Sequence, residues 1–258
     1  MSRRTIIFAA VWVLAVVAGA WIVIDVTAYG GLAGRAALAE DLSADELEQR
    51  IRDYILQHPE VIVEALRNFE ERQQAAAANK TQSVIASRRD EIFNDPATPI
   101  GGNPDGDVSI VEFFDYNCPY CRKNAPTLTE LERTDPNLRF VYKEWPILGP
   151  GSEFAARAAL AAVRQGKYVA YHKAMMEFSG RITEDTALEV GGTVGIDIER
   201  LKQDMEDPAI QEAIERNRDL ARALGVTGTP AFVVNDRFLP GMQEMPVLQD
   251  VIRLAREN

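Results

Sequence analysis

Residues 108–121 read Val-Ser-Ile-Val-Glu-Phe-Phe-Asp-Tyr-Asn-Cys-Pro-Tyr-Cys, an apolar run that leads into two cysteines three positions apart. Apolar side chains at most positions of 108–114 predict a strand that is buried on both faces. Cys118 and Cys121 follow directly, and Pro119 suits the first turn of a helix because it has no N–H to leave unpaired. The stretch therefore predicts a strand, a turn and a helix, with two thiols where the helix begins.

This position gives the two thiols different chemistry. The thiolate is the reactive form of cysteine, and a helix N-terminus lowers the pKa of a thiol through its partial positive charge and free amide donors. Cys118 is predicted to be the exposed attacking thiol, and Cys121, one turn further in, the buried thiol that resolves a mixed disulfide. The chain has only these two cysteines, and a disulfide between them closes a ring too small to stabilise a fold appreciably. The pair is therefore predicted to be redox-active.

A metal site is the competing interpretation of the two cysteines. Structural zinc requires four ligands, and the other candidates, His58 and His172, lie far apart in the chain. A Cu(I) site on two thiolates stays open, since soft thiolates favour that ion. A formal net charge of -11 argues against nucleic acid as a partner. We expect no resident metal and no cofactor.

The N-terminus predicts export. Arg3 and Arg4 precede an uncharged run over residues 6–24 that is long enough to span a bilayer. Residues 1–30 are interpreted either as an uncleaved signal anchor or as a signal peptide removed at a small-residue site. The remainder is expected on the periplasmic side of the bacterial inner membrane, anchored there, or free in the periplasm after cleavage.

A helical arm is predicted over residues 43–93, after a Gly- and Ala-rich spacer. Ser43 and Glu46 have the spacing of a capping box, and Pro59 is expected to interrupt the helix. Its narrow apolar stripe requires a partner surface. Packing on the chain's own domain and association between chains both stay open, and the second would make a homo-oligomer through residues 43–92.

The rest of the chain predicts an α/β domain over residues 105–258. A breaker-rich segment, residues 94–107, is interpreted as a hinge before it. The expected elements are a strand at 108–114, a helix at 125–133, a strand at 139–145, a helical block at about 152–223, paired strands at 231–239 and a helix at 246–256. Four helices of the block are expected to have N-caps, at Ser152, Thr183, Asp197 and Asp207. Pro208 follows Asp207 at a first helical position, which suits proline. This order predicts an α/β fold with an inserted helical subdomain.

Two motifs resemble the DsbA-like branch of the thioredoxin superfamily. They are residues 111–121, which end in Cys118-Pro119-Tyr120-Cys121, and residues 226–232, Val-Thr-Gly-Thr-Pro-Ala-Phe. The resemblance implies a thioredoxin fold, thiol–disulfide exchange and a cis peptide bond before Pro230, facing the cysteines. The backbone of Thr229 would then pair with an extended substrate segment, so that Thr229 and Pro230 bind substrate.

Glu112 is the third candidate site residue. Alternation places it on the same strand face as Ile110 and Phe114, where an unpaired carboxylate would be costly. It is either a strand-end glutamate that reaches solvent or, as in the DsbA-like family, a buried group that accepts the proton of Cys121. Lys143 is expected to be its partner.

The direction of electron flow stays open. The Pro-Tyr dipeptide lacks the histidine of strongly oxidising DsbA proteins, and threonine precedes Pro230, as in exported isomerases. The arm and the Cys-Pro-Tyr-Cys centre also look like ScsC-type proteins associated with copper tolerance. The resemblance implies an isomerase or oxidase that acts on thiol- or disulfide-containing exported proteins, with a membrane redox partner of DsbB or DsbD type. A Cu(I)-binding module and a membrane-tethered assembly scaffold are the alternatives.

Overall fold

The computed structural model describes residues 43–257. The predicted membrane segment and spacer lie outside the described residues. Within residues 43–257, no helix combines the length and the apolar character that a membrane crossing requires. The chain divides into two units, one that ends at Glu70 and one that begins at Glu71.

The first unit contains α2 (Ala44–Gln57) and the start of α3 (Glu60–Ser87). The predicted capping box is confirmed: Oγ of Ser43 accepts from the Glu46 amide at 3.3 Å, and the Glu46 carboxylate accepts from the Ser43 amide at 3.1 Å. The predicted break at Pro59 is confirmed as well, since it separates the two helices. No residue of α2 is buried, so its apolar side chains face solvent in the single chain.

The second unit is built on a five-stranded mixed sheet in the order β1-β3-β2-β4-β5. Its strands are β1 (Ile100–Gly102), β2 (Val108–Phe114), β3 (Leu138–Glu144), β4 (Ala231–Val234) and β5 (Arg237–Pro240). β2 and β3 are parallel, and the other pairs are antiparallel. The strands expected from the sequence are confirmed. The hinge interpretation is wrong for residues 100–102, because they form β1 at the edge of the sheet.

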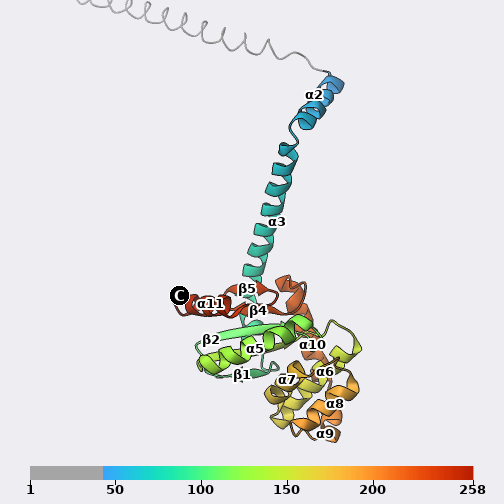
Figure 1. The fold of residues 1–258 in the computed structure, drawn as a ribbon, viewed down its shortest axis with the longest axis vertical. Coiled ribbons are helices and arrows are strands. Elements are labelled where there is room, and N and C mark those ends of the chain that lie inside the picture. The colour runs from blue at the N-terminus through green and yellow to red at the C-terminus, as the bar shows by residue number, and fades with distance from the viewer. Residues whose placement is uncertain (1–42, 258) are drawn as a thin grey trace, which may run out of the picture. The chain divides into compact units, whose positions relative to one another are not determined.

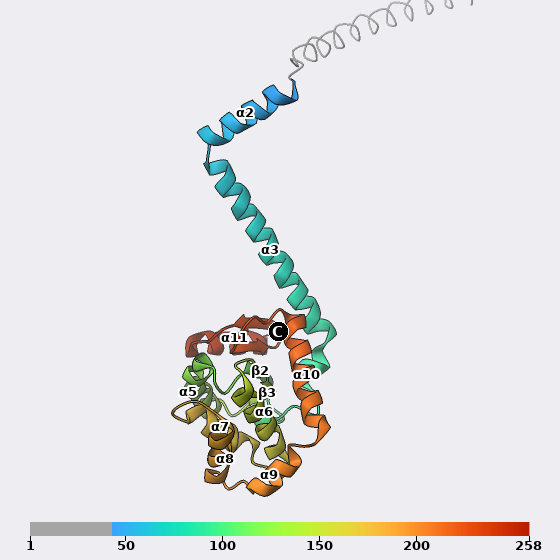
Figure 2. The same cartoon turned by 90° about the vertical axis from the view of Figure 1, so that its right-hand side faces the viewer.

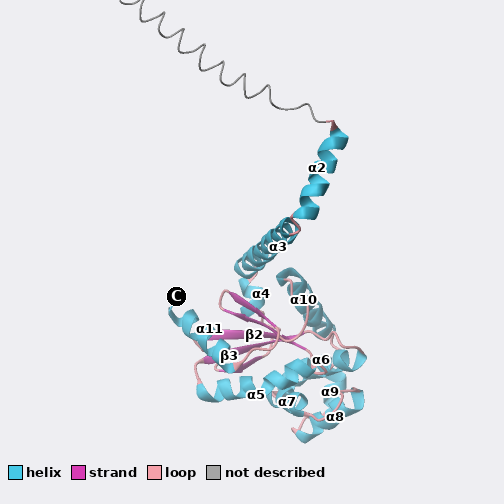
Figure 3. Cartoon of the chain, turned by 45° about the horizontal axis from the view of Figure 1, so that its top comes forward, coloured by secondary structure: helices cyan, strands magenta, loops and turns pink. Residues whose placement is uncertain are grey.

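Helices cover both faces of the sheet. In chain order they are α4 (Arg89–Phe93), α5 (Pro119–Thr134), α6 (Pro150–Ala162), the 3-10 helix η1 (Val163–Gln165), α7 (Tyr168–Glu177), α8 (Glu184–Thr193), α9 (Ile198–Asp204), α10 (Pro208–Leu224) and α11 (Met245–Glu257). Figure 3 shows α5 and α11 on one side of the sheet and α4 and α10 on the other. The helices α6 to α10 form the insertion between β3 and β4 (Figures 1 and 2). This is the predicted thioredoxin-like α/β fold with a helical insertion.

The caps within the insertion are largely as predicted. Thr183, Asp197 and Asp207 accept backbone amide hydrogen bonds at the starts of α8, α9 and α10. The prediction that Ser152 caps α6 is wrong, because Gly149 is the N-cap and Ser152 lies inside the first turn. The hydroxyl of Ser152 is directed to the loop that carries the cysteines.

The two faces of the sheet pack into separate apolar clusters. Ile110 and Phe114 face the cluster that includes α5, α11 and the insertion, whereas Val111 and Phe113 face the cluster with α4 and the end of α10. β2 is therefore buried on both sides, as its sequence predicts. Its carboxyl end directs the chain into the turn before Cys118.

Candidate active site

The cysteines lie where the sequence predicts, at the junction of β2 and α5. Cys118 is the N-cap of α5, and its amide donates to the carbonyl of Asp115 at 3.0 Å. Both thiols are free. Cys121 is 1% exposed, as expected, but Cys118 is only 4% exposed, and the prediction of an exposed thiol is wrong in that respect. Another loop lies against it: Sγ of Cys118 donates to the carbonyl oxygen of Thr229 at 3.1 Å.

The two thiols have opposite pKa shifts. A hydrogen bond from Cys121, with smaller contributions from the Thr229 side chain and the amides of Cys121 and Tyr120, lowers the pKa of Cys118 to about 5. Burial raises the pKa of Cys121 well above its ordinary value, and the hydrogen bond to Cys118 raises it further. Near neutral pH, Cys118 is therefore a thiolate and Cys121 a thiol.

The loop against Cys118 contains the second motif. The bond between Thr229 and Pro230 is cis, as the family resemblance implies. β4 begins at the next residue and pairs antiparallel with β2, with Ala231 opposite Phe113. This pairing brings two segments that are distant in sequence together at one end of the sheet.

Glu112 is buried, with 4% of its surface exposed, so it is not a strand-end glutamate in solvent. Burial, and secondly the negative charge of Cys118, raises the pKa of its carboxyl to about 8. The expected partner is wrong. Lys143 pairs with Phe113 in the parallel register and so lies on the opposite face, where its ammonium donates to the carbonyl of Glu91 and the hydroxyl of Thr98, both at 2.7 Å.

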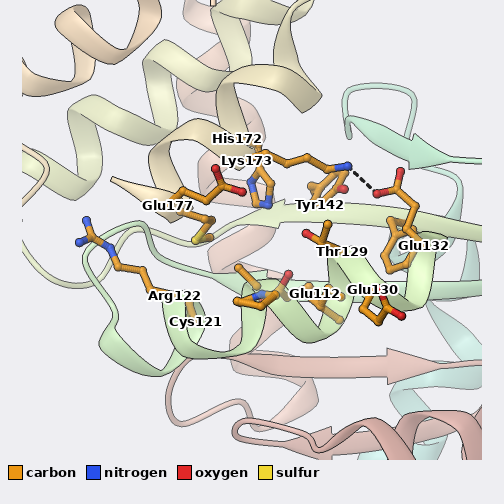
Figure 4. A pocket seen from close by; sticks show the side chains of 15 residues that line it. Glu112, Cys121, Arg122, Thr129, Glu130, Glu132, Tyr142, His172, Lys173 and Glu177 are labelled. Carbon is orange, nitrogen blue, oxygen red and sulfur yellow. Dashed lines mark hydrogen bonds and ion pairs between the residues drawn. The ribbon is translucent and has the colours of Figure 1, made fainter. Parts of the chain in front are cut away.

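A cavity of about 430 Å³ between α5 and α7 joins Glu112 to Cys121 (Figure 4). Both residues line it, together with the apolar side chains of α5 and β3. An ion pair between Lys173 and Glu132, 2.6 Å from Nζ to Oε2, connects its two helical walls. The Glu112 carboxyl has no hydrogen-bond partner among residues 43–257, so this cavity is where it meets water.

Sequence reasoning missed Asp115, which organises the turn before Cys118. Its carboxylate accepts from the amides of Asn117, Ile147 and Leu148 and from the hydroxyl of Ser152, at 2.7–3.0 Å. It thereby holds the loop after β3 and the start of α6 against the cysteine loop. The only sequence signal is an acidic residue at the end of an apolar strand.

A second buried group was also missed. One oxygen of Glu144 accepts from the hydroxyls of Tyr116 and Tyr168, at 2.8 and 2.7 Å. His172 lies 3.3 Å from the Tyr116 hydroxyl, and burial lowers its pKa to about 3, so it is neutral. This network joins the end of the sheet to α7 and touches neither thiol.

Within residues 43–257, no group of three or more His, Cys, Asp or Glu side chains is arranged to hold a metal ion.

A stabilised thiolate, a buried partner thiol and a cis-proline loop on this fold define a thiol:disulfide oxidoreductase. Residues 109–253 match the DSBA-like thioredoxin domain family, and the chain belongs to that family. Residues 45–76 match the copper resistance protein ScsC N-terminal domain. The two matches confirm the similarity to ScsC-type proteins.

Several solved structures and curated proteins are similar to this chain. A thioredoxin-like oxidoreductase from Silicibacter pomeroyi is 53% identical, with a TM-score of 0.65, over 66% of this chain and 98% of that one. The thiol-disulfide exchange protein alpha-DsbA2 from Wolbachia pipientis is 31% identical, with a TM-score of 0.64, over 69% and 98%. A probable disulfide bond formation protein D of Bacillus cereus is 28% identical over 59% of this chain and 78% of its own length. The chain spans only 24% of the length of a further relative, the Na(+)/H(+) antiporter NhaA 1 of Salinispora arenicola.

Proposed function

We propose that this protein exchanges disulfides with exported proteins, with Cys118 as the attacking thiol and Cys121 as the resolving thiol. The main support for this proposal is that the pKa of Cys118 is lowered whereas the pKa of Cys121 is raised. The Cys118 thiolate attacks a substrate disulfide, forms one S–S bond and releases one substrate thiolate. Cys121 then attacks the sulfur of Cys118, which releases the second substrate thiolate and leaves the Cys118–Cys121 disulfide.

Glu112 would accept the proton of Cys121 in the second step. The negative charge of Cys118 is one cause of the raised pKa of Glu112. That charge disappears when Cys118 enters a mixed disulfide, so the pKa of Glu112 falls and its carboxylate becomes available when Cys121 must deprotonate. The shared cavity gives the proton a route to water.

The loop at Thr229 and Pro230 would bind the substrate backbone. While Cys118 is protonated, the Thr229 carbonyl accepts a hydrogen bond from its thiol. In the thiolate and in a mixed disulfide no S–H remains, so the carbonyl can accept an amide from an extended substrate strand. The backbone site at Thr229 is then open in the forms of Cys118 that attack and hold the substrate.

The direction, isomerase or oxidase, would be set by the redox potential and by a membrane partner of DsbB or DsbD type. A thiolate with a pKa of about 5 stabilises the reduced form. We expect a potential between about -270 mV, typical of thioredoxin, and about -120 mV, typical of DsbA. Equilibration with glutathione measures it, and refolding of scrambled ribonuclease tests isomerisation.

The decisive test of the reaction is turnover of a peptide disulfide by the parent protein and by Cys118→Ser. Loss of turnover in the variant supports the proposal. Undiminished turnover overturns it and favours the scaffold alternative. Tight Cu(I) binding by a reduced parent that shows no turnover would favour the copper-binding alternative.

We also propose that the arm, residues 43–93, assembles chains into a homo-oligomer on the periplasmic side of the membrane, with residues 105–258 as the catalytic domain. The apolar stripe of α2, with Leu47, Ile51 and Tyr54 exposed, supports this. Light scattering of the parent and of Ile51→Glu tests it. A parent protein whose measured mass in solution is that of a monomer would overturn the proposed oligomer.

A further inference from the structure

A second hollow, of about 440 Å³, opens beside the cysteine motif, and Arg122 lines both this hollow and the cavity at Glu112. Its lining residues are Asn117, Arg122, Leu148, Gly180 and Arg181. Asn117 directly precedes Cys118, and Arg122 directly follows Cys121. The hollow, here called the arginine hollow, therefore lies at the edge of the surface where a substrate disulfide must approach.

Hydrogen bonds fix the loop that carries Arg181. The side-chain amide of Asn117 donates to the carbonyl of Ile182 at 2.9 Å, and its oxygen accepts from the amide of Ile182 at 2.8 Å. The loop before α8 is thus attached to the residue that precedes the nucleophile. A methyl group placed at Gly149 would lie 3.9 Å from Nη2 of Arg181, so this guanidinium extends to the loop before α6.

The guanidinium of Arg122 lies among backbone carbonyls. It donates to the carbonyl oxygens of Tyr116 at 2.6 Å, Phe178 at 3.2 Å, and Gly180. Its Nη2 has no hydrogen-bond partner among residues 43–257. Burial lowers the pKa of Arg122, but arginine keeps its charge even so. A positive charge therefore remains in the wall of the hollow.

Neither guanidinium forms an ion pair with a carboxylate in the described part of the chain. Asp115 acts on Arg122 only through space, and its two oxygens already accept four hydrogen bonds. Elsewhere the charge is strongly negative, -11 for the whole chain. The arginine hollow thus places two positive charges close together on a chain whose net charge is negative.

We propose that the arginine hollow binds a carboxylate of the substrate close to the disulfide that Cys118 attacks. Arg181, which is exposed, makes the contact, because the guanidinium fork matches a carboxylate. Arg122 adds its charge from the wall of the hollow. The proposal rests on the proposed function and names a preferred substrate class: disulfides flanked by acidic groups.

The test is the rate at which reduced protein reacts with two small disulfides. Glutathione disulfide carries carboxylates, and hydroxyethyl disulfide is neutral. In each reaction Cys118 bonds to one probe sulfur, and the other sulfur leaves as a thiolate that takes a proton from solvent. Arg181→Gln is compared with Arg237→Gln, which removes the same charge from β5.

We expect Arg181→Gln to slow the reaction with glutathione disulfide about threefold, and Arg181→Glu about tenfold, with no change for the neutral probe. Arg237→Gln should leave both rates unchanged. Equal slowing by the two Gln variants would show an effect of net charge alone and would overturn the proposal. A parent protein that reacts with neither probe would instead overturn the proposed function.

Peptide disulfides with Asp or Asn two residues from the cysteine distinguish the sources of the carboxylate. A preference for Asp that Arg181→Gln abolishes assigns the hollow to protein substrates. An effect on glutathione disulfide alone assigns it to small anionic disulfides. No effect of Arg181→Gln on either probe would refute carboxylate binding.

Discussion

Replacing Glu112 by glutamine should make the protein more stable, and increasingly so as the pH rises. The carboxyl has an ordinary pKa of 4.5 and a folded-state pKa of about 8. Between these values the folded protein holds one proton that the unfolded chain has released, so the free energy of unfolding falls as the pH rises. At about 1.4 kcal/mol per pKa unit, the loss is about 3 kcal/mol at pH 7 and about 5 kcal/mol above pH 8.

Glutamine has nearly the same shape and no proton to lose, so the Glu112→Gln variant escapes this loss. The measurement is urea unfolding of the parent and the variant from pH 4 to 9, in a background with serine at both cysteine positions. That background removes thiol titration and keeps burial, the main cause of the raised pKa. The two proteins should be equally stable near pH 4 and diverge as the pH rises, by at most about 3 kcal/mol at pH 7, because the part of the pKa shift that the Cys118 charge supplies is absent in this background.

Glu177→Gln is the matched control, because Glu177 lines the same cavity but is exposed. It should change stability little and equally at all pH values. If Glu112→Gln differs from the parent by the same amount at pH 5 and pH 8, burial does not hold the carboxyl protonated. The proposed proton transfer from Cys121 would then lose its basis.

Further changes test the thiols and the packing. Cys121→Ser should accumulate mixed disulfides, seen as reducible high-mass bands on gels; free protein alone would contradict its resolving role. Gly151→Ala should destabilise by about 1–3 kcal/mol in urea unfolding, because the added methyl group collides with a backbone carbonyl before α8, whereas Gly192→Ala has open space and should stabilise by about 0.5–1 kcal/mol. Thr98→Val removes an acceptor from the buried ammonium of Lys143 and should cost about 1–3 kcal/mol in the same assay; an unchanged midpoint would show that water replaces the hydroxyl.

Local signals in the sequence predicted most of the elements. The apolar run of β2, the capping box at Ser43 and the proline after Asp207 each act within a few residues, and each is confirmed. The position of Cys118 at a helix start follows from the same local rules. The cis bond at Pro230 came from resemblance alone, since no local rule in the sequence requires it.

The errors concern contacts between distant segments. Lys143 was assigned to the face of Glu112, but the parallel register of β2 and β3 sets it opposite Phe113. Serine is a residue type that often caps helices, yet the hydroxyl of Ser152 donates to the carboxylate of Asp115, 37 positions earlier. Neither register nor loop proximity is encoded in local periodicity, so only the assembled fold reveals them.

The separation of the two halves of the site along the chain has a consequence for biosynthesis. The thiol of Cys118 and the carbonyl of Thr229, which lies against it, are 111 positions apart. Chains emerge N-terminal end first, so the whole helical insertion is made before the proline loop exists. For that interval both thiols are present without the loop that later covers Cys118. A nascent molecule therefore carries reactive sulfur before the loop proposed to bind substrate has been made, and that proposed surface is complete only once the C-terminal hairpin has formed.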